Sequence, residues 1–293
     1  MRDGVSASCV ALPAGPWPLV LDFLSERLPR IARADWLARL QRGDVLDERG
    51  QVLPADAPFR PNTRLYYFRQ LDAEPAIPFE AQIVHQDDTL LVADKPHFLP
   101  VTPGGRYVQQ TLLTRLKRAT GIDTLTPIHR IDRETAGLVL FSIRPADRNA
   151  FQSLFRERAV EKVYEAIAPF RQDLTLPLTR RSRMLERAEA FMQMEEVAEG
   201  EPNAETLITL IERLGDQGRY ELRPRTGQKH QLRVHMSALG VPILGDRIYP
   251  VLKPEEAVPD FNHPLQLLAR EIAFVDPLSG EHRRFVSGLA LRW

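Results

Sequence analysis

One acidic residue of the sequence is surrounded by cations. Asp132 stands in the segment PIHRIDRETAGLVLFS, between Arg130 and Arg133, and an apolar strand-like run from Leu138 to Phe141 follows it. A carboxylate among cations tends to remain ionised and to be held in one orientation, which suits a nucleophile better than a general acid. Taken from composition alone, a structural ion pair in a loop is the commoner explanation for such a pattern.

A second segment with chemical potential is RPRTGQKHQLRVHMSALG, which predicts a loop and then a helix that ends at Gly240. Spacing of i, i+3, i+4 and i+7 gives this helix an apolar face of four residues, Leu232, His235, Met236 and Leu239. We expect Arg233, on another face, to point away from the core. His235, on the apolar face, is expected to be a hydrogen-bonded core residue.

The loop before this helix carries Arg225, Thr226 and Gly227, with Lys229 just beyond. Backbone N–H groups at the start of a helix, together with positive charge, form a suitable cradle for a phosphate of a nucleic-acid backbone. The sequence therefore predicts a phosphate contact here.

Other chemistries fit the sequence poorly. His230 and His235 are five residues apart, which is not the i, i+4 spacing of two zinc ligands on one helical face. The sequence has no Gly-x-Ser-x-Gly elbow, no phosphate-binding loop ending in Gly-Lys-Ser/Thr, and no dinucleotide fingerprint after a strand. We expect no metal site, and the hydrolase, NTPase and dehydrogenase classes are disfavoured.

Length and composition describe an ordinary globular chain. Its 293 residues, 43% of them hydrophobic, are enough to bury a sizeable core. The apolar stretch from Cys9 to Leu24 is interrupted by prolines, so we expect neither a membrane span nor a secretory signal. Cys9 is the single cysteine and has no partner for a disulfide. These features indicate a cytoplasmic protein.

The formal net charge is zero, yet the charges are unevenly distributed. Two runs are basic, namely Arg180, Arg181, Arg183 and Arg187, and Arg223, Arg225, Lys229 and Arg233. Acids collect between them, at Glu195, Glu196, Glu199, Glu201 and Glu205. Local basic surfaces on a neutral protein can bind phosphates, although a solvated face is the commoner outcome for a single run.

The first part of the chain, residues 1–77, is expected to be a small separate module. Helical patterns span Val20 to Leu28 and Ala34 to Arg42, and turn-rich strands follow around Val45 and Val52. This pattern resembles, at low detail, a small RNA-binding module named after a small-subunit ribosomal protein, and a plain structural extension fits it nearly as well. Prolines in the stretch from residue 74 to residue 78 mark the boundary.

Residues 78–293 mix strands and helices without a regular βαβ alternation. A hairpin is expected in AQIVHQDDTLLVADKP, a helix from Val108 to Thr120 before Gly121, and a second helix that begins near Pro145. Strand-like runs then recur at KVYEAIA, TLITLIERL, RYELRPR and EIAFVD. The expected fold class is therefore α+β, with a largely antiparallel mixed sheet flanked by helices and loops.

Four segments, in order, resemble the RluA-type pseudouridine synthases, which isomerise uridine in ribosomal and transfer RNA. They are LLVADKPHFLPVTPGG, HRIDRETAGLVLFS, VEKVYEAI and RTGQKHQLRVHMSALGVPILGDRIYP, and they span most of residues 80–293. The resemblance implies the pseudouridine synthase fold for this region. It also implies a reaction that retains every substrate atom, and hence no cofactor.

The resemblance also implies roles for individual residues. Asp132 would be the nucleophile, Tyr164 would pack against the target base and act in removing the carbon 5 proton, and Arg233 would pair with the catalytic carboxylate. Further residues would contact the RNA: His129 and Arg130 in the loop beside the flipped base, and Leu232 next to the pocket. Structured RNA, such as a stem-loop of ribosomal or transfer RNA, is the implied partner, and the implied enzyme is a monomer.

Several positions depart from the usual family pattern, namely Asp94, Phe98, Ala136, Gln228, Leu268 and Asp276. Asp132, Tyr164 and Arg233 are all present. Two alternatives remain open from the residues: an RNA-binding or RNA-folding protein without catalysis on the same scaffold, and a metal-independent hydrolase that uses Asp132 and His129. The hydrolase lacks a recognisable oxyanion-stabilising partner.

Overall fold

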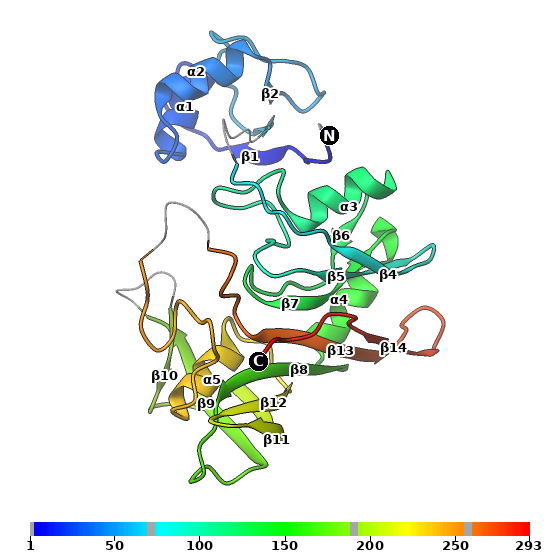
Figure 1. Ribbon diagram of the computed structural model, residues 1–293. Coiled ribbons are helices and arrows are strands. Elements are labelled where there is room, and N and C mark those ends of the chain that lie inside the picture. Colours follow the sequence, from blue (N-terminus) through cyan, green and yellow to red (C-terminus); the bar gives the residue numbers. More distant parts are fainter. Residues whose placement is uncertain (1–2, 69–73, 188–192, 255–259) are drawn as a thin grey trace. The chain divides into compact units, whose positions relative to one another are not determined.

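The structure is a computed structural model that describes residues 3–68, 74–187, 193–254 and 260–293 (Figure 1). The chain divides into two compact units, Met1–Glu74 and Pro75–Trp293. Each unit has its own hydrophobic core.

The first unit packs two helices against a small sheet. α1 (Val20–Arg27) and α2 (Arg33–Gln41) confirm the two predicted helices to within a residue or so at each end. The described strands are ordered β1 (Ser8–Leu12), β3 (Thr63–Tyr67) and β2 (Val45–Leu46), all antiparallel. The strand expected near Val52 is a single bridge to Leu46, and β1 and β3 were not predicted. Phe23, Leu24 and Trp36 are fully buried at its centre.

The second unit is built on a sheet that has eleven strands within the described residues, in the order β10-β9-β11-β12-β8-β13-β7-β5-β4, with β14 beside β13 and β6 beside β7. Their bounds are β4 (Gln82–Gln86), β5 (Leu90–Lys95), β6 (Thr126–Pro127), β7 (Ala136–Ser142), β8 (Val160–Pro169), β9 (Leu178–Glu186), β10 (Met194–Val197), β11 (Ala204–Leu214), β12 (Gln217–Pro224), β13 (Leu267–Val275) and β14 (His282–Val286). Among these strands, only the β7–β13 pair is parallel. The predicted α+β class with a largely antiparallel mixed sheet is confirmed.

The predicted hairpin and strand runs of this unit are also confirmed. β4 and β5 are joined at Asp87, whose carboxylate accepts the backbone N–H groups of Thr89 and Leu90 at 2.7 and 2.8 Å. The four later strand-like runs lie in β8, β11, β12 and β13. β9, β10 and β14 were not predicted, because their alternating charged residues lack a strong apolar signal.

Helices cover the sheet. α3 (Leu112–Thr120) begins four residues later than the predicted Val108, because Thr111 caps it by accepting the N–H of Thr114. Gly121, at φ 71°, ends it as expected. α4 (Arg148–Arg156) follows a 3₁₀ turn, η1 (Pro145–Asp147), and α5 (Gln231–Ala238) ends just before Gly240.

β5 and β7 are buried on both faces, which explains why they are continuous apolar runs in the sequence. Leu91 and Val139 belong to one core with α3, whereas Leu90 and Leu138 belong to another core that contains Phe151 of α4. Side chains alternate between the faces of a strand, so each strand serves both cores. A third core joins α5 to β8, β11 and β12.

Gly137 allows β7 and β13 to approach each other. Its φ is 111°, and a Cβ atom built there lies 2.3 Å from the carbonyl oxygen and 2.7 Å from the nitrogen of Ala269. Ala269 is its partner in the parallel ladder, which joins β7 to the rest of the sheet. A side chain at position 137 is therefore incompatible with this pairing.

Replacement of this glycine has a predictable cost. Gly137→Ala is expected to lower the free energy of unfolding by about 3 kcal/mol or more, because backbone strain and a backbone clash act together. Gly280→Ala is the matched control. Gly280 has φ 76°, but a Cβ atom built there has nothing within 4 Å, so strain alone gives about 1 kcal/mol. Urea unfolding measures both, and equal losses would contradict the role given to Ala269.

His235 of α5 is a core residue, as expected. It is fully buried, with Nε2 3.0 Å from the Ser182 hydroxyl and Nδ1 3.0 Å from the Thr206 hydroxyl. Burial lowers the pKa of His235 to about 4, against 6.5 for a free histidine. The folded chain thus keeps this ring neutral where the unfolded chain protonates it.

This histidine makes a defined contribution to acid sensitivity. Between pH 6.5 and pH 4 the unfolded state binds one more proton at His235, so stability falls by about 1.4 kcal/mol per pH unit from this group. We expect His235→Gln to reduce the slope of unfolding free energy against pH in that window by about this amount. Urea titrations across the window measure the slope, and an unchanged slope would show that His235 does not titrate there.

Candidate active site

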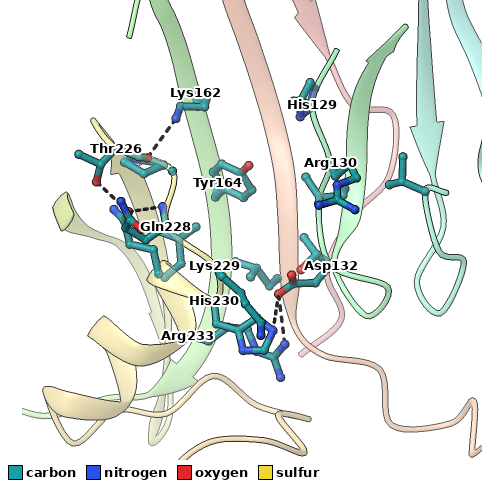
Figure 2. A pocket seen from close by; sticks show the side chains of 18 of the residues that line it. His129, Arg130, Asp132, Lys162, Tyr164, Thr226, Gln228, Lys229, His230 and Arg233 are labelled. Carbon is teal, nitrogen blue, oxygen red and sulfur yellow. Dashed lines mark hydrogen bonds and ion pairs between the residues drawn. The ribbon is translucent and has the colours of Figure 1, made fainter. Parts of the chain in front are cut away.

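A cavity of about 780 Å³ lies in the second unit, between the loop before β7, the middle of β8 and the segment that enters α5 (Figure 2). Every residue that the sequence predicted for the site lines it: Asp132, Tyr164, Arg233, His129, Arg130, Leu232, Arg225, Thr226 and Lys229. Asp132 and Arg233 are 101 positions apart in the chain, so the fold assembles the site.

Asp132 presents its carboxylate at one end of the cavity. Its side chain is 29% exposed, and its Oδ2 lies 3.2 Å from Nη1 of Arg233 and 3.8 Å from Nε2 of His230 (Figure 2). The N–H of Thr135 donates to the backbone carbonyl of Asp132 at 3.2 Å, which closes a tight turn just before β7. The carboxylate is therefore held yet open to a ligand.

Arg233 is the partner of this carboxylate, but it is not at the surface. The expectation that it points away from the core is wrong, because its side chain is only 2% exposed. The second face of α5 is covered by the segment around Asp246, which helical periodicity alone does not reveal. The Nε and Nη2 atoms of Arg233 donate to the two oxygens of Asp246 at 2.8 and 2.6 Å. Although burial acts in the opposite direction, Asp246 raises the pKa of Arg233 above its usual value.

Asp246 was not predicted, and it fixes the arginine. Besides the two bonds from Arg233, its Oδ1 accepts the backbone N–H groups of Ile248 and Tyr249 at 2.8 and 3.0 Å. A carboxylate with this many donors has one orientation. The signal was an acid in the GDRIYP stretch that ends the last of the four segments.

His230 was also missed as a site residue. It precedes α5 in a left-handed conformation, with φ 55°, and its Nδ1 lies 2.9 Å from the hydroxyl of Tyr249. That hydroxyl accepts the N–H of Met194 at 2.7 Å, so its own proton is free to be donated to Nδ1. This arrangement leaves a proton on Nε2, which faces Asp132. Burial lowers the pKa of His230 despite the nearby carboxylate.

Tyr164 projects from β8 into the middle of the cavity (Figure 2). Burial, with a further contribution from the charge of Asp132, raises the pKa of Tyr164 above its ordinary value. Its hydroxyl is therefore protonated at neutral pH.

The loop that carries Asp132 is supported from behind by Lys95, at the end of β5. Lys95 is fully buried, and its ammonium donates to the carbonyls of Pro96 and Arg133 at 2.9 and 3.0 Å. Burial lowers the pKa of Lys95 to about 7, against an opposing effect of Glu134. This lysine ties the loop to the sheet at the residue after Asp132.

His129 and Arg130 lie at the other side of the same loop. The ring of His129 stacks on Phe155 at 4.6 Å, and its Nε2 accepts the N–H of Leu140 at 3.2 Å. Burial and the charge of Lys162 lower the pKa of His129 to about 3, so the ring is neutral. Arg130 is exposed. Leu232 is 8% exposed and joins the core beneath α5 while lining the cavity.

The predicted phosphate cradle differs from expectation. α5 begins at Gln231, several residues after Gly227, and the N–H groups of Arg225 and Gln228 donate to Glu205 and to the side chain of Gln231. Those two donors are therefore not free. Thr226 is buried, and its hydroxyl donates to Gln231 Oε1 at 2.7 Å and accepts the N–H of Glu205 at 2.9 Å.

Most of the basic runs are neutralised by the acids of the neighbouring strands. On β9, Arg180 pairs with Glu196, and Arg181 pairs with Glu205 at 3.0 Å. Arg225 lies 3.7 Å from the same Glu205, and Lys229 lies 3.0 Å from Glu186. The arginines of the first run thus pair with acids of the two strands beside β9.

Four of the six departures from the family pattern are accommodated structurally. Asp94 is buried and accepts the Ser287 hydroxyl and the Gly288 N–H, both at 2.8 Å. Asp276 is buried against Arg283 at 2.7 Å. Ala136 and Leu268 face each other in the parallel ladder. Within the described residues there is no cluster of three metal-ligating side chains, and none of the helices has the length and hydropathy of a membrane span.

The Arg233–Asp246 pair gives a direct test of the site's support. Asp246→Asn is expected to lower the free energy of unfolding by about 3–5 kcal/mol, because it leaves the buried guanidinium without its partner. Asp173→Asn, at an exposed Asp–Arg pair with Arg171, is the matched control and is expected to leave stability essentially unchanged. Urea unfolding of both variants measures this. Equal effects would show that burial of the pair is unimportant.

Comparison with known proteins identifies the family. A family profile described as RNA pseudouridylate synthase matches residues 89–238. The dual-specificity RNA pseudouridine synthase RluA of Pasteurella multocida is 32% identical over 216 residues, covering 69% of this chain and 90% of that protein. An uncharacterized RNA pseudouridine synthase of Synechocystis is 30% identical over 234 residues, covering 78% and 79% of the two chains.

Solved structures agree with the sequence relatives. Human RNA pseudouridylate synthase domain containing 4 superposes with a TM-score of 0.54 at 28% identity, over 71% of this chain and 88% of that one. Human RNA pseudouridylate synthase domain containing 1 gives a TM-score of 0.58 at 23% identity, over 73% and 86%. The chain therefore belongs to the RluA-type family of RNA pseudouridine synthases, which are isomerases.

Proposed function

We propose that the chain isomerises a specific uridine in structured ribosomal or transfer RNA, with Asp132 as the nucleophile. One observation carries this proposal above the others. A half-buried carboxylate faces the cavity and is held by a buried arginine that is itself fixed by a second carboxylate. This arrangement holds the Asp132 carboxylate in one orientation toward the cavity, as a nucleophile requires.

In the proposed reaction Asp132 attacks the target nucleotide and the bond between N1 and the ribose carbon breaks. The uracil then turns in the cavity and rejoins the ribose through carbon 5, and the bond to Asp132 breaks, which regenerates the free carboxylate. The hydrogen of carbon 5 is lost and one hydrogen is gained at N1, so the product is an isomer of the substrate. Because no atom or electron enters or leaves, the chemistry requires neither a cofactor nor a metal.

Tyr164 is proposed to pack against the uracil ring. Its position on β8, between the two ends of the cavity, fits this role. The raised pKa favours packing over a role as a ready-made base, because its phenol is protonated in the free site. If Tyr164 removes the carbon 5 proton, its own proton must first move to another group.

The substrate is proposed to be a stem-loop. The target base has to leave its stack to reach Asp132, which costs roughly a few kcal/mol and least where the base is already unpaired. Sequence-specific RNA recognition mainly uses such loops. Two relatives are named dual-specificity RNA pseudouridine synthases and another is named a tRNA pseudouridine synthase, which supports keeping more than one class of RNA, transfer RNA among them, as candidate substrates.

Further parts of the proposal concern the whole protein. We propose a cytoplasmic monomer in which His129, Arg130, Leu232, Arg225, Thr226 and Lys229 contact the RNA, and in which residues 1–77 help to hold it. A non-catalytic RNA-binding protein is the second candidate. Pure binding has no need of a carboxylate that faces an anionic ligand, which favours the enzyme. A hydrolase that uses Asp132 and His129 is disfavoured, because the neutral ring of His129 accepts a backbone N–H through Nε2.

Pseudouridine mapping of total RNA tests the proposal. Cells without the gene are expected to lose pseudouridine at one or more uridines, and wild type is expected to restore it. Asp132→Asn is expected to abolish isomerisation while leaving the fold and much of the RNA affinity intact, since only the nucleophile is lost. Asp88→Asn, at an exposed residue outside the cavity, is the control and should restore modification fully.

Two outcomes would contradict the proposal. Substantial turnover by Asp132→Asn would remove Asp132 from the role of nucleophile. If deletion changed no site in any RNA, the RNA-binding candidate would take precedence.

A further inference from the structure

Three cations that line the cavity lack an acidic partner among the described residues. Arg133, Arg225, Lys229 and Arg233 each pair with a carboxylate. Within the described part of the chain, no carboxylate lies within salt-bridge distance of Arg130, Arg158 or Lys162. Of these three, Lys162 is partly buried, and an unpaired charge away from water is costly unless a ligand supplies the opposite charge.

Lys162 stands on β8, two residues before Tyr164, so the two side chains project from the same face of the strand about 7 Å apart. Its ammonium donates to the carbonyl of Thr226 at 3.1 Å. An ammonium has three N–H donors, and this bond uses one of them. Burial and the charge of Arg158 lower the pKa of Lys162 to about 8, and both cations line the same cavity.

Arg158 occupies a position where glycine is the usual residue. It follows α4 with φ 59°; its N–H donates to Phe155 O, and the N–H of Ala159 donates to Leu154 O. These two bonds form a Schellman turn, whose left-handed residue is most often glycine. A side chain there costs about 1 kcal/mol in backbone strain. The arginine is exposed and lines the cavity.

His129 supplies a third donor. Its Nε2 accepts the N–H of Leu140, so in the neutral ring the proton is on Nδ1. Among the described residues, none accepts a hydrogen bond from Nδ1. The ring stacks on Phe155, whose carbonyl accepts the N–H of Arg158, so the histidine and this arginine lie on adjacent segments.

We propose that Lys162, Arg158 and Nδ1–H of His129 form a subsite for a backbone phosphate of the RNA next to the flipped uridine. Figure 2 shows Lys162 and His129 at the end of the cavity away from Asp132, with Tyr164 between the two ends. A base in the middle of the cavity thus has the nucleophile on one side and this phosphate site on the other.

The chemistry of the subsite favours a phosphodiester over a base. Two cations and an N–H group present only donors, and a phosphate offers oxygens that accept on several sides. A base edge presents both donors and acceptors, whereas the three side chains of the subsite can only donate. The subsite rests on the proposed function in that the anion belongs to the RNA substrate.

The test uses the full chain and a stem-loop RNA with a single loop uridine, which fixes the register. Arg158→Gly removes the guanidinium and leaves a residue suited to the turn, so folding stability is expected to be unchanged or slightly higher. RNA affinity is expected to fall about 10-fold, and the slope of log affinity against log salt by about 0.7. Arg156→Ala, two residues earlier on α4 and outside the cavity, is the control.

Lys162→Met is the second variant, with Lys253→Met, an exposed lysine outside the cavity, as its control. Each phosphate near the uridine is replaced in turn by a neutral methylphosphonate. In wild type one replacement is expected to weaken binding about 10-fold, and in Lys162→Met and Arg158→Gly the same replacement is expected to have little further effect. With an RNA that the enzyme isomerises, both variants should show a raised KM and little change in kcat.

The outcomes separate the two proposals. The subsite is refuted if both variants bind RNA as tightly as their controls. It is also refuted if every methylphosphonate replacement weakens binding equally in wild type and in the two variants. Neither outcome depends on whether the enzyme isomerises the RNA. If coupling to one phosphate is observed but no RNA is isomerised, the subsite stands and the proposed reaction fails. If Lys162→Met does not fold, the measurements on Arg158→Gly alone decide the test.

Discussion

The site depends on a chain of three charges in which a buried arginine lies between two carboxylates. Asp246 is fixed by two backbone N–H groups, Arg233 is fixed by Asp246, and Asp132 is held by the remaining face of Arg233. A buried guanidinium is stable only with such partners. As a consequence, both oxygens of Asp246 accept hydrogen bonds, whereas the Asp132 carboxylate keeps an exposed side toward the cavity.

The elements around these three charged side chains each hold one part of the site in place. Lys95 holds the backbone just after Asp132, and the stacked ring of His129 holds the backbone before it. His230 approaches the carboxylate from α5. The loop is therefore fixed on both sides of Asp132, while Tyr164 comes from a strand at the centre of the sheet. The site is preorganised by contacts that are themselves made by buried groups.

Much of the fold was accessible from the sequence, because apolar periodicity reports burial directly. The doubly buried β5 and β7, the hairpin at Asp87 and the helix stop at Gly121 all follow from local patterns. Charged β9 and β10 were missed, since their residues pair with each other across strands. Arg233 was located correctly along the chain but not in depth, because its cover comes from Asp246, a contact that no local pattern specifies.

Asp132 enters from the β4–β7 side of the sheet, whereas Tyr164 and Arg233 belong to the side that contains β8 and α5. The two sides meet in a parallel ladder of two residue pairs, Leu268 with Ala136 and Ala269 with Gly137. Asp132 and its partners are thus brought together across a very short seam. Parting there would separate Asp132 from Tyr164 and Arg233, and it would also divide the core that joins β5 and β7 to β8 and β13. The site therefore exists only while the two sides of the sheet remain joined at the β7–β13 ladder.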